Sequence, residues 1–84
     1  MNSQLTKLVE YMKSHKIYGA KHIPEELIIN SRTRHLSKSE RKEFLDAYHD
    51  HEFLFHKLKK RTGRGSEWHI SLNVKELANF QNIE

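Results

Sequence analysis

Apolar residues in the first part of the chain recur at the spacing of an α-helix. Positions i, i+3, i+4 and i+7 are occupied by Leu5, Leu8, Val9 and Met12. This pattern predicts an amphipathic helix over residues 3–15. Asn2 or Ser3 precedes the stripe, and either side chain can cap the free N–H groups of the first turn.

A second, shorter helix is expected to start at Pro24, because the missing N–H and the fixed φ of proline suit a first helical turn. Glu25 and Glu26 follow, where carboxylates favour the positive end of the helix dipole. Its buried stripe is predicted to hold Ile23, Leu27 and Ile28. The polar stretch over residues 30–36 is interpreted as the connection to the next helix.

Ser37 and Glu40 have the spacing of a capping box, in which each side chain reaches a backbone N–H of the other residue. A third helix is therefore expected over residues 38–50. Its buried side is predicted to hold Phe44, Leu45 and Tyr48. Its outer side is predicted to carry Ser39, Lys42, Glu43, Asp46 and Asp50, with Lys38 and His49 at the border.

After residue 50 the hydrophobic period changes from helical to alternating. Trp68, Ile70 and Leu72 alternate with polar residues, which predicts a half-buried strand. Residues 53–59 are its expected antiparallel mate, and residues 60–66 contain two glycines that suit a hairpin turn. Asn73 and Glu76 repeat the capping pattern before a final short helix, which is expected over residues 74–80 and would bury Leu77, Ala78 and Phe80.

Length and composition indicate one folded domain over residues 1–84. Hydrophobic residues make up 36% of the chain, and the absence of cysteine excludes disulfides and thiolate metal sites. No apolar run approaches the length of a membrane span, so we expect no membrane association and a cytoplasmic protein.

Charge is distributed in blocks, although the formal net charge is only +4. Residues 31–42 and 57–64 are rich in Lys and Arg, whereas residues 43–56 carry acids and no Lys or Arg. If the two basic clusters meet on one surface, they form an electrostatic footprint for a polyanion such as DNA. The alternative is that they are only solvated faces.

Three helices followed by a hairpin with the turn Lys-Lys-Arg-Thr-Gly-Arg-Gly-Ser make an α+β order that resembles the winged helix-turn-helix family. The resemblance covers residues 3–73 and implies that the third helix enters the major groove of double-stranded DNA while the hairpin wing contacts its backbone or minor groove. Carried over by position, the DNA-contacting residues would be Arg32, Arg34, Lys38, Ser39, Lys42, Lys59, Lys60, Arg61 and Arg64.

Two features of the hairpin bear on what it could bind. Arg61 and Arg64 flank Gly63, which has no side chain to keep the backbone away from a phosphate or a narrow groove, although charge at a hairpin tip also serves solubility. An aromatic residue beside basic residues can stack on an unpaired nucleobase. The alternation of Trp68 with Ile70 instead predicts that Trp68 belongs to the core.

Seven histidines raise the question of a metal or catalytic site. The segment over residues 49–56 lacks metal-binding spacings such as HExxH, so no metal or cofactor is predicted. Glu67 and His69 would share one face of a strand and could be combined with Arg64 as an acid/base set, but we expect no enzyme. Mild acid adds charge to histidines and should strengthen nucleic-acid binding.

The sequence therefore favours a non-enzymatic DNA-binding protein, a small transcriptional or replication regulator, which could read two half-sites as a homodimer. The alternative is a protein-interaction module on the same fold, docking a polymerase subunit or another regulator, with RNA binding as a third hypothesis. The DNA hypothesis requires the connection after the second helix and the hairpin tip to project toward a common side.

Overall fold

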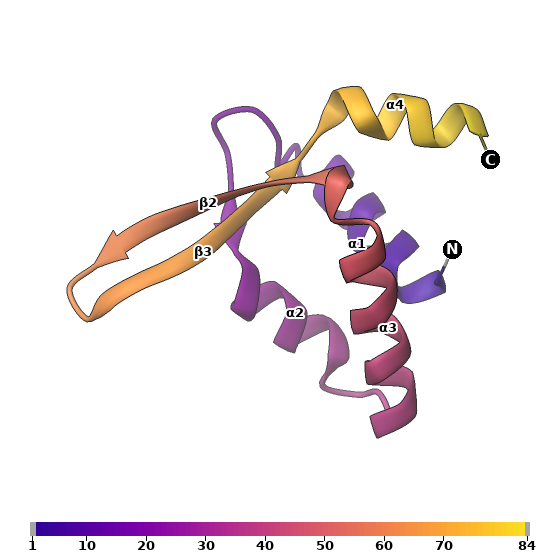
Figure 1. Cartoon of the computed structure of the whole chain (residues 1–84), viewed down its shortest axis with the longest axis horizontal. Coiled ribbons are helices and arrows are strands. Elements are labelled where there is room, and N and C mark those ends of the chain that lie inside the picture. The colour runs from indigo at the N-terminus through magenta and orange to yellow at the C-terminus, as the bar shows by residue number, and fades with distance from the viewer. Residues whose placement is uncertain (1, 84) are drawn as a thin grey trace.

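The computed structural model describes the backbone of residues 2–83 and the side chains of residues 2–78. In chain order the elements are α1 (Ser3–Ser14), β1 (Ile23–Pro24), α2 (Glu25–Thr33), α3 (Lys38–Asp50), the 3₁₀ turn η1 (Glu52–Leu54), β2 (Phe55–Thr62), β3 (Gly65–Leu72) and α4 (Val74–Ile83). The three helices α1, α2 and α3 pack together, and the β2–β3 hairpin extends away from them (Figure 1).

The predicted first helix is confirmed, and Asn2 is its cap. The Asn2 Oδ1 atom accepts hydrogen bonds from the backbone N–H of Gln4, at 2.9 Å, and of Leu5, at 3.2 Å. The apolar stripe that predicted the helix is buried, with Leu5, Leu8 and Met12 at 0% exposure.

The second helix differs from its prediction at both ends. Pro24 lies in β1 with ψ of 127° and occupies the N-cap position, so the helix begins at Glu25. It continues to Thr33, whose hydroxyl donates to the carbonyl of Ile29 at 2.9 Å. The connection to α3 is therefore the four residues 34–37, not a segment that starts at residue 30.

The predicted buried stripe of α2 is wrong at one position. Ile28 is buried, whereas the Leu27 side chain is 67% exposed. Successive residues of a helix differ in direction by about 100°, and the covered side of α2 includes Ile28 but not Leu27.

The third helix has the predicted bounds. Its capping box is complete, because Ser37 Oγ accepts from the Glu40 N–H and Glu40 Oε1 accepts from the Ser37 N–H, both at 3.2 Å. Phe44 and Tyr48 are buried, and Leu45 is half-buried at the border of the core.

The sheet has three antiparallel strands in the order β1-β3-β2. The hairpin pairs Phe55 with Leu72 at its base and Thr62 with Gly65 at its tip, leaving Gly63 and Arg64 as the turn. Only Gly65 of the two glycines has a positive φ, of 134°. Strand β1 was not predicted, because two residues carry no alternation of their own.

The predicted alternation of burial along β3 is also wrong. Residues 65–68 are exposed on both faces, whereas residues 69–72 are buried on both faces. The base of the hairpin is covered by the rest of the protein, and the outer half projects into solvent (Figure 1). Parity along a strand decides which face a side chain takes, but not whether that face is covered.

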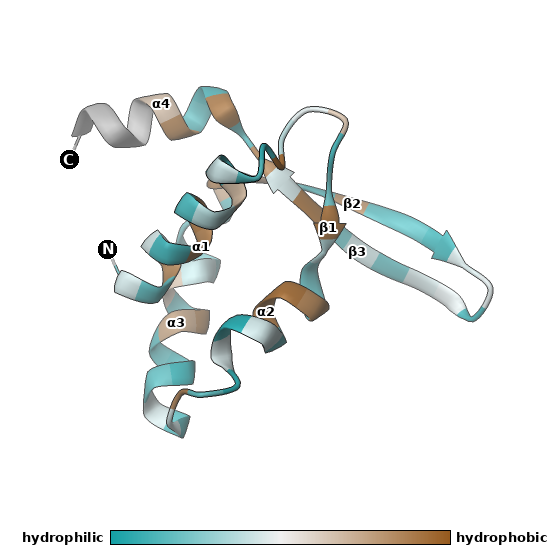
Figure 2. Ribbon diagram, turned by 180° about the vertical axis from the view of Figure 1, so that it is seen from behind, coloured by the Kyte–Doolittle hydropathy of each residue, from teal (hydrophilic) through white to brown (hydrophobic). Residues whose placement is uncertain are grey.

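One cluster of buried apolar side chains joins the helices to the base of the hairpin. Apolar segments of the helices and of the hairpin base are brown in Figure 2, while most of the outer hairpin is hydrophilic. The last helix is capped as predicted, with the Glu76 N–H donating to Asn73 Oδ1 at 3.4 Å, and it buries Leu77. Ala78 is exposed, and the side chain of Phe80 lies outside the described residues.

The molecule is thus a small α+β protein with helices followed by a three-stranded antiparallel sheet, an arrangement compatible with a winged-helix-like fold. Within residues 2–83, no helix has the length and apolar character that crossing a membrane requires.

Candidate functional site

The register of the hairpin divides its basic residues between two faces. Residues paired across antiparallel strands point to the same face, so Lys57, Lys59 and Arg61 share a face with their partners Ile70, Trp68 and Ser66. Phe55, at the base of that face, packs on Tyr48 of α3 with ring centroids 5.2 Å apart. We call this the α3-side face of the hairpin (residues 55, 57, 59, 61, 66, 68, 70 and 72).

The predicted site residue Lys60 lies on the opposite face. It pairs with Glu67, next to the pair of Leu58 with His69. Arg64 lies in the turn between the two faces, with its backbone N–H donating to Thr62 Oγ1 at 3.3 Å. The predicted cluster of basic residues on the hairpin is therefore split. Of the predicted residues, only Lys59 and Arg61 share the α3-side face.

Lys57 anchors the α3-side face to the helices. Its Nζ atom lies 3.1 Å from Glu25 Oε2 at the start of α2 and 3.6 Å from Glu52 Oε1 after α3. The hydrogen bond from His49 to Glu52, at 3.0 Å, lowers the pKa of the Glu52 carboxyl, and the nearby Lys57 charge lowers it further. Lys57 is thus neutralised by two carboxylates and fixes the base of the hairpin against α3.

The predicted core position of Trp68 is wrong. Its side chain is 48% exposed on the α3-side face. The ammonium groups of Lys57 and Lys59 lie 5.6 and 5.9 Å from its ring centroid, within cation–π range. The sequence signal that could have revealed this is the position of Trp68 only four residues after Arg64 of the turn, in the outer half of the hairpin.

A basic stripe on α3 leads toward the hairpin. Residues at successive spacings of four, three and four share one side of a helix, and here they are Lys38, Lys42, Leu45 and His49. His49, at the end of this stripe, bonds Glu52, which contacts Lys57 of the hairpin. Sequence reasoning identified Lys38 and Lys42 but not that their stripe meets the hairpin.

The acids of α3 occupy a different stripe. Ser39, Glu43, Asp46 and Asp50 follow the same spacing, rotated by about 100° from the basic stripe. All four are exposed. The predicted site residue Ser39 therefore belongs to the acidic side of the helix, and the remaining predicted α3 residues belong to the side that leads to the hairpin.

Arg32 and Arg34 lie apart from the basic residues of α3 and of the hairpin. Arg32 is in the last turn of α2, not in the connection, and its guanidinium carbon lies 4.6 Å from the ring centroid of Tyr11 in α1. Arg34 lines a shallow hollow shared with Tyr11 and Ile23, on the α1 side of α2. Both arginines therefore lie near Tyr11 of α1. Helix α2 begins beside the hairpin and ends at the connection to α3, so this connection lies at the end of α2 away from the hairpin (Figure 1). The expected convergence of the connection and the hairpin tip on a common side is not observed.

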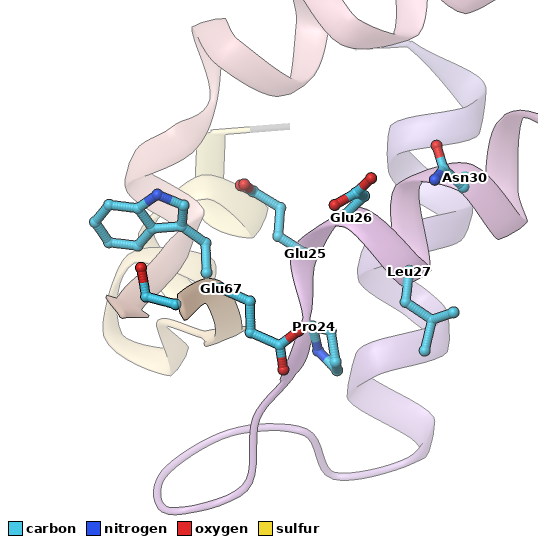
Figure 3. Close-up of a pocket in the computed structure, with 8 residues that line it drawn as sticks. Pro24, Glu25, Glu26, Leu27, Asn30 and Glu67 are labelled. Carbon is cyan, nitrogen blue, oxygen red and sulfur yellow. The ribbon is translucent and has the colours of Figure 1, made fainter. Parts of the chain in front are cut away.

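A groove lies between the start of α2 and the outer half of β3 (Figure 3). Its lining residues are Pro24, Glu25, Glu26, Leu27, Asn30, Ser66, Glu67 and Trp68. Glu25 is paired with Lys57, and Glu67 is bonded to His69. Glu26 and Leu27 extend from the first turn of α2, and Glu67 points toward Pro24 (Figure 3).

The opposite face of the sheet carries a histidine pair that the sequence did not indicate. The Nδ1 atoms of His22 and His69 lie 2.7 Å apart, and His69 Nε2 lies 2.8 Å from Glu67 Oε1. Glu67 and His69 share one face as predicted. The third residue of this group is His22, which contacts His69, and not Arg64. Among the described residues, no group of three or more His, Asp or Glu side chains is placed to hold a metal ion.

Comparison of the chain with protein-family models, with curated proteins and with solved structures finds no match.

Proposed function

We propose that the protein is a non-enzymatic double-stranded DNA-binding protein that uses α3 and the hairpin in the manner of a winged helix-turn-helix domain. The observation that carries the proposal is the junction of His49, Glu52 and Lys57, where the basic stripe of α3 meets the α3-side face of the hairpin. One approaching duplex could contact both at once.

The arrangement of elements supports the same proposal. The α2–α3 connection has four residues, the length typical of a helix-turn-helix. The hairpin follows α3 and is tied to it through Lys57, as a wing beside a recognition helix would be. In this role the protein would act as a small cytoplasmic regulator of transcription or replication, and a homodimer would let it read two half-sites.

Each basic group would have a distinct task. The first turns of α3 would enter the major groove, where Lys38 and Lys42 reach base edges or phosphates. Lys59, Arg61 and Arg64 would bind backbone phosphates beside α3, releasing counterions from the duplex. The acidic stripe, rotated by about 100° from the basic one, would lie beside the groove without contacting the DNA. The proposal rests on α3 and the hairpin and makes no use of Arg32 or Arg34.

Fluorescence anisotropy with a short labelled duplex, at salt concentrations from about 50 to about 250 mM, tests the proposal. Five phosphate contacts predict a log–log slope of about −4 to −5. The double change Lys59→Ala and Arg61→Ala should make this slope shallower by about two. Lys60→Ala, on the opposite face of the same strand, is the matched control and should change it by less than about one. Failure to bind any duplex at about 50 mM salt would rule out the proposal.

The second candidate is a protein-interaction module that docks a basic partner protein. The observation that favours it is the acidic stripe of α3, because Glu43, Asp46 and Asp50 are exposed on one side of the helix. Neutralising these acids would weaken such a complex, but would not weaken DNA binding.

A further inference from the structure

Trp68 is the only tryptophan of the chain and stands on the surface proposed to meet DNA. About half of its side chain, 48%, is exposed on the outer half of the hairpin. Leu27, which is 67% exposed, lines the same groove as Trp68, so two large exposed apolar side chains share one site. Lys57 and Lys59 lie within 6 Å of the Trp68 ring centroid, at 5.6 and 5.9 Å.

The groove beside Trp68 suits a neutral aromatic group better than a phosphate. Pro24 of β1 and Leu27 of α2 supply apolar walls, and the groove also carries the carboxylates of Glu25, Glu26 and Glu67. Glu25 is paired with Lys57 and Glu67 with His69, and Glu26 is exposed. A phosphate in this groove would meet the negative charge of Glu26. A nucleobase carries no net charge to be repelled, and its amino groups could donate to a carboxylate or to Asn30.

Hydrogen-bonding groups of the backbone also face the groove. The Leu72 N–H donates to Ile17 on one side of β3, and the Asn73 N–H donates to Leu54 on the other side. Backbone groups alternate in direction along a strand, so those of Ser66 point to the same side as those of Leu72, away from β2. Ser66 lies beyond the last pair of β3 with β1, Pro24 with His69, and it lines the groove.

The positive charges that a strand of DNA needs lie directly beside the ring. Lys59 and Arg61 follow Lys57 at intervals of two residues and share its face, so they form a row along the hairpin next to Trp68. Proteins hold single-stranded nucleic acid with a row of basic side chains beside an exposed aromatic ring. The phosphates bind the basic side chains, and a nucleobase stacks on the ring.

We propose that Trp68 and the adjoining groove receive an unpaired nucleobase, so that the protein prefers DNA containing unpaired bases over a fully paired duplex. The proposal rests on the DNA-binding function proposed above. The phosphates flanking the base lie along Lys59 and Arg61. The base stacks on the indole and presents its hydrogen-bonding edge to the groove.

The test compares a fully paired duplex with the same duplex carrying a short unpaired bubble at its centre. Stacking of one base on an aromatic side chain is expected to favour the bubble by about tenfold in Kd. The bubble should also quench the fluorescence of Trp68, which is the only indole in the chain, and the paired duplex should quench it much less. Trp68→Ala should remove the preference, and Trp68→Phe should keep most of it because phenylalanine also stacks.

Leu58→Ala is the matched control, because Leu58 is an apolar side chain with 38% exposure on the opposite face of the same hairpin. It should leave the preference intact. Equal affinities of the wild-type protein for the two DNAs, or a preference that survives Trp68→Ala, would overturn the inference while duplex binding stands. Absence of binding to either DNA would overturn the DNA-binding function as well. The quenching measurement uses the wild-type chain, so the inference stays testable even if Trp68→Ala does not fold.

Discussion

The hydroxyl of Tyr48 donates to Glu25 Oε2 at 2.6 Å, joining the buried side of α3 to the first residue of α2. The same carboxylate oxygen accepts from Lys57 of β2 at 3.1 Å. One carboxylate therefore holds together α2, α3 and the hairpin, and the relative position of helix and wing depends on it.

Removing the hydroxyl should destabilise the protein measurably. Tyr48 is 1% exposed, so Tyr48→Phe deletes a buried hydrogen bond to a charged group while keeping the ring in place. Bonds of this kind contribute about 1.5–3 kcal/mol, and we expect the free energy of unfolding in urea to fall by about 2 kcal/mol. Tyr18→Phe, at a site with 39% exposure, is the control and should change it very little. A loss below about 0.5 kcal/mol for Tyr48→Phe would mean that Lys57 alone satisfies Glu25.

The same phenol should make the protein sensitive to alkali. Burial, and then the hydrogen bond to Glu25, raise the pKa of Tyr48 above its ordinary value of 10.0. Above that pH the unfolded chain loses the proton and the folded chain keeps it, so stability is full below pH 10.0 and falls as pH rises further. At about one pH unit higher, the loss should be about 1.4 kcal/mol. Urea unfolding across this range should show a smaller decline for Tyr48→Phe, and equal declines would contradict the argument.

The start of α3 offers a third test. Ser37 and Glu40 each satisfy a backbone N–H of the other, and both side chains are exposed, so the effect of the cap is separated from core packing. Ser37→Ala should lower the free energy of unfolding by about 1 kcal/mol. In a domain of this size the midpoint of thermal unfolding should fall by about 4–8 °C. Ser31→Ala, at an exposed position within α2, is the comparison and should have little effect on the midpoint.

The parts of the fold that the sequence predicted are those decided by neighbouring residues. The stripe of α1, the cap of Asn2 and the box of Ser37 with Glu40 all involve residues within one or two helical turns, so spacing alone determines them. Strand β1 could not be predicted in this way. Ile23 finds its partner Ile70 at the far end of the chain, and only the folded helices bring the two together.

The candidate site shows the same division. Blocks of charge predicted which segments are basic, but the sequence pattern placed Lys60 in the turn. Strand β2 continues to Thr62, and Lys59 and Lys60, as successive residues of that strand, point to opposite faces. Arg32 was misplaced because a polar run resembles a loop, whereas packing on Tyr11 extends the helix through it. Trp68 was misplaced because alternation cannot reveal how far the helices reach along the hairpin.

The acidic stripe of α3 separates the two candidate functions. If α3 lies in the major groove with its basic stripe toward the DNA, Glu43 and Asp46 stand close enough to the phosphates to repel them, with a weak, screened interaction. Glu43→Gln combined with Asp46→Asn should then strengthen duplex binding by about two- to fivefold at low salt, with less effect as salt screens the charges. Both residues are exposed, so the substitutions should leave the unfolding midpoint unchanged. The matched change Lys38→Gln with Lys42→Gln, on the other stripe, should weaken binding. Duplex affinity that falls on neutralising the acids would contradict this orientation of α3, and the case for a basic partner protein on that side would then be the stronger one.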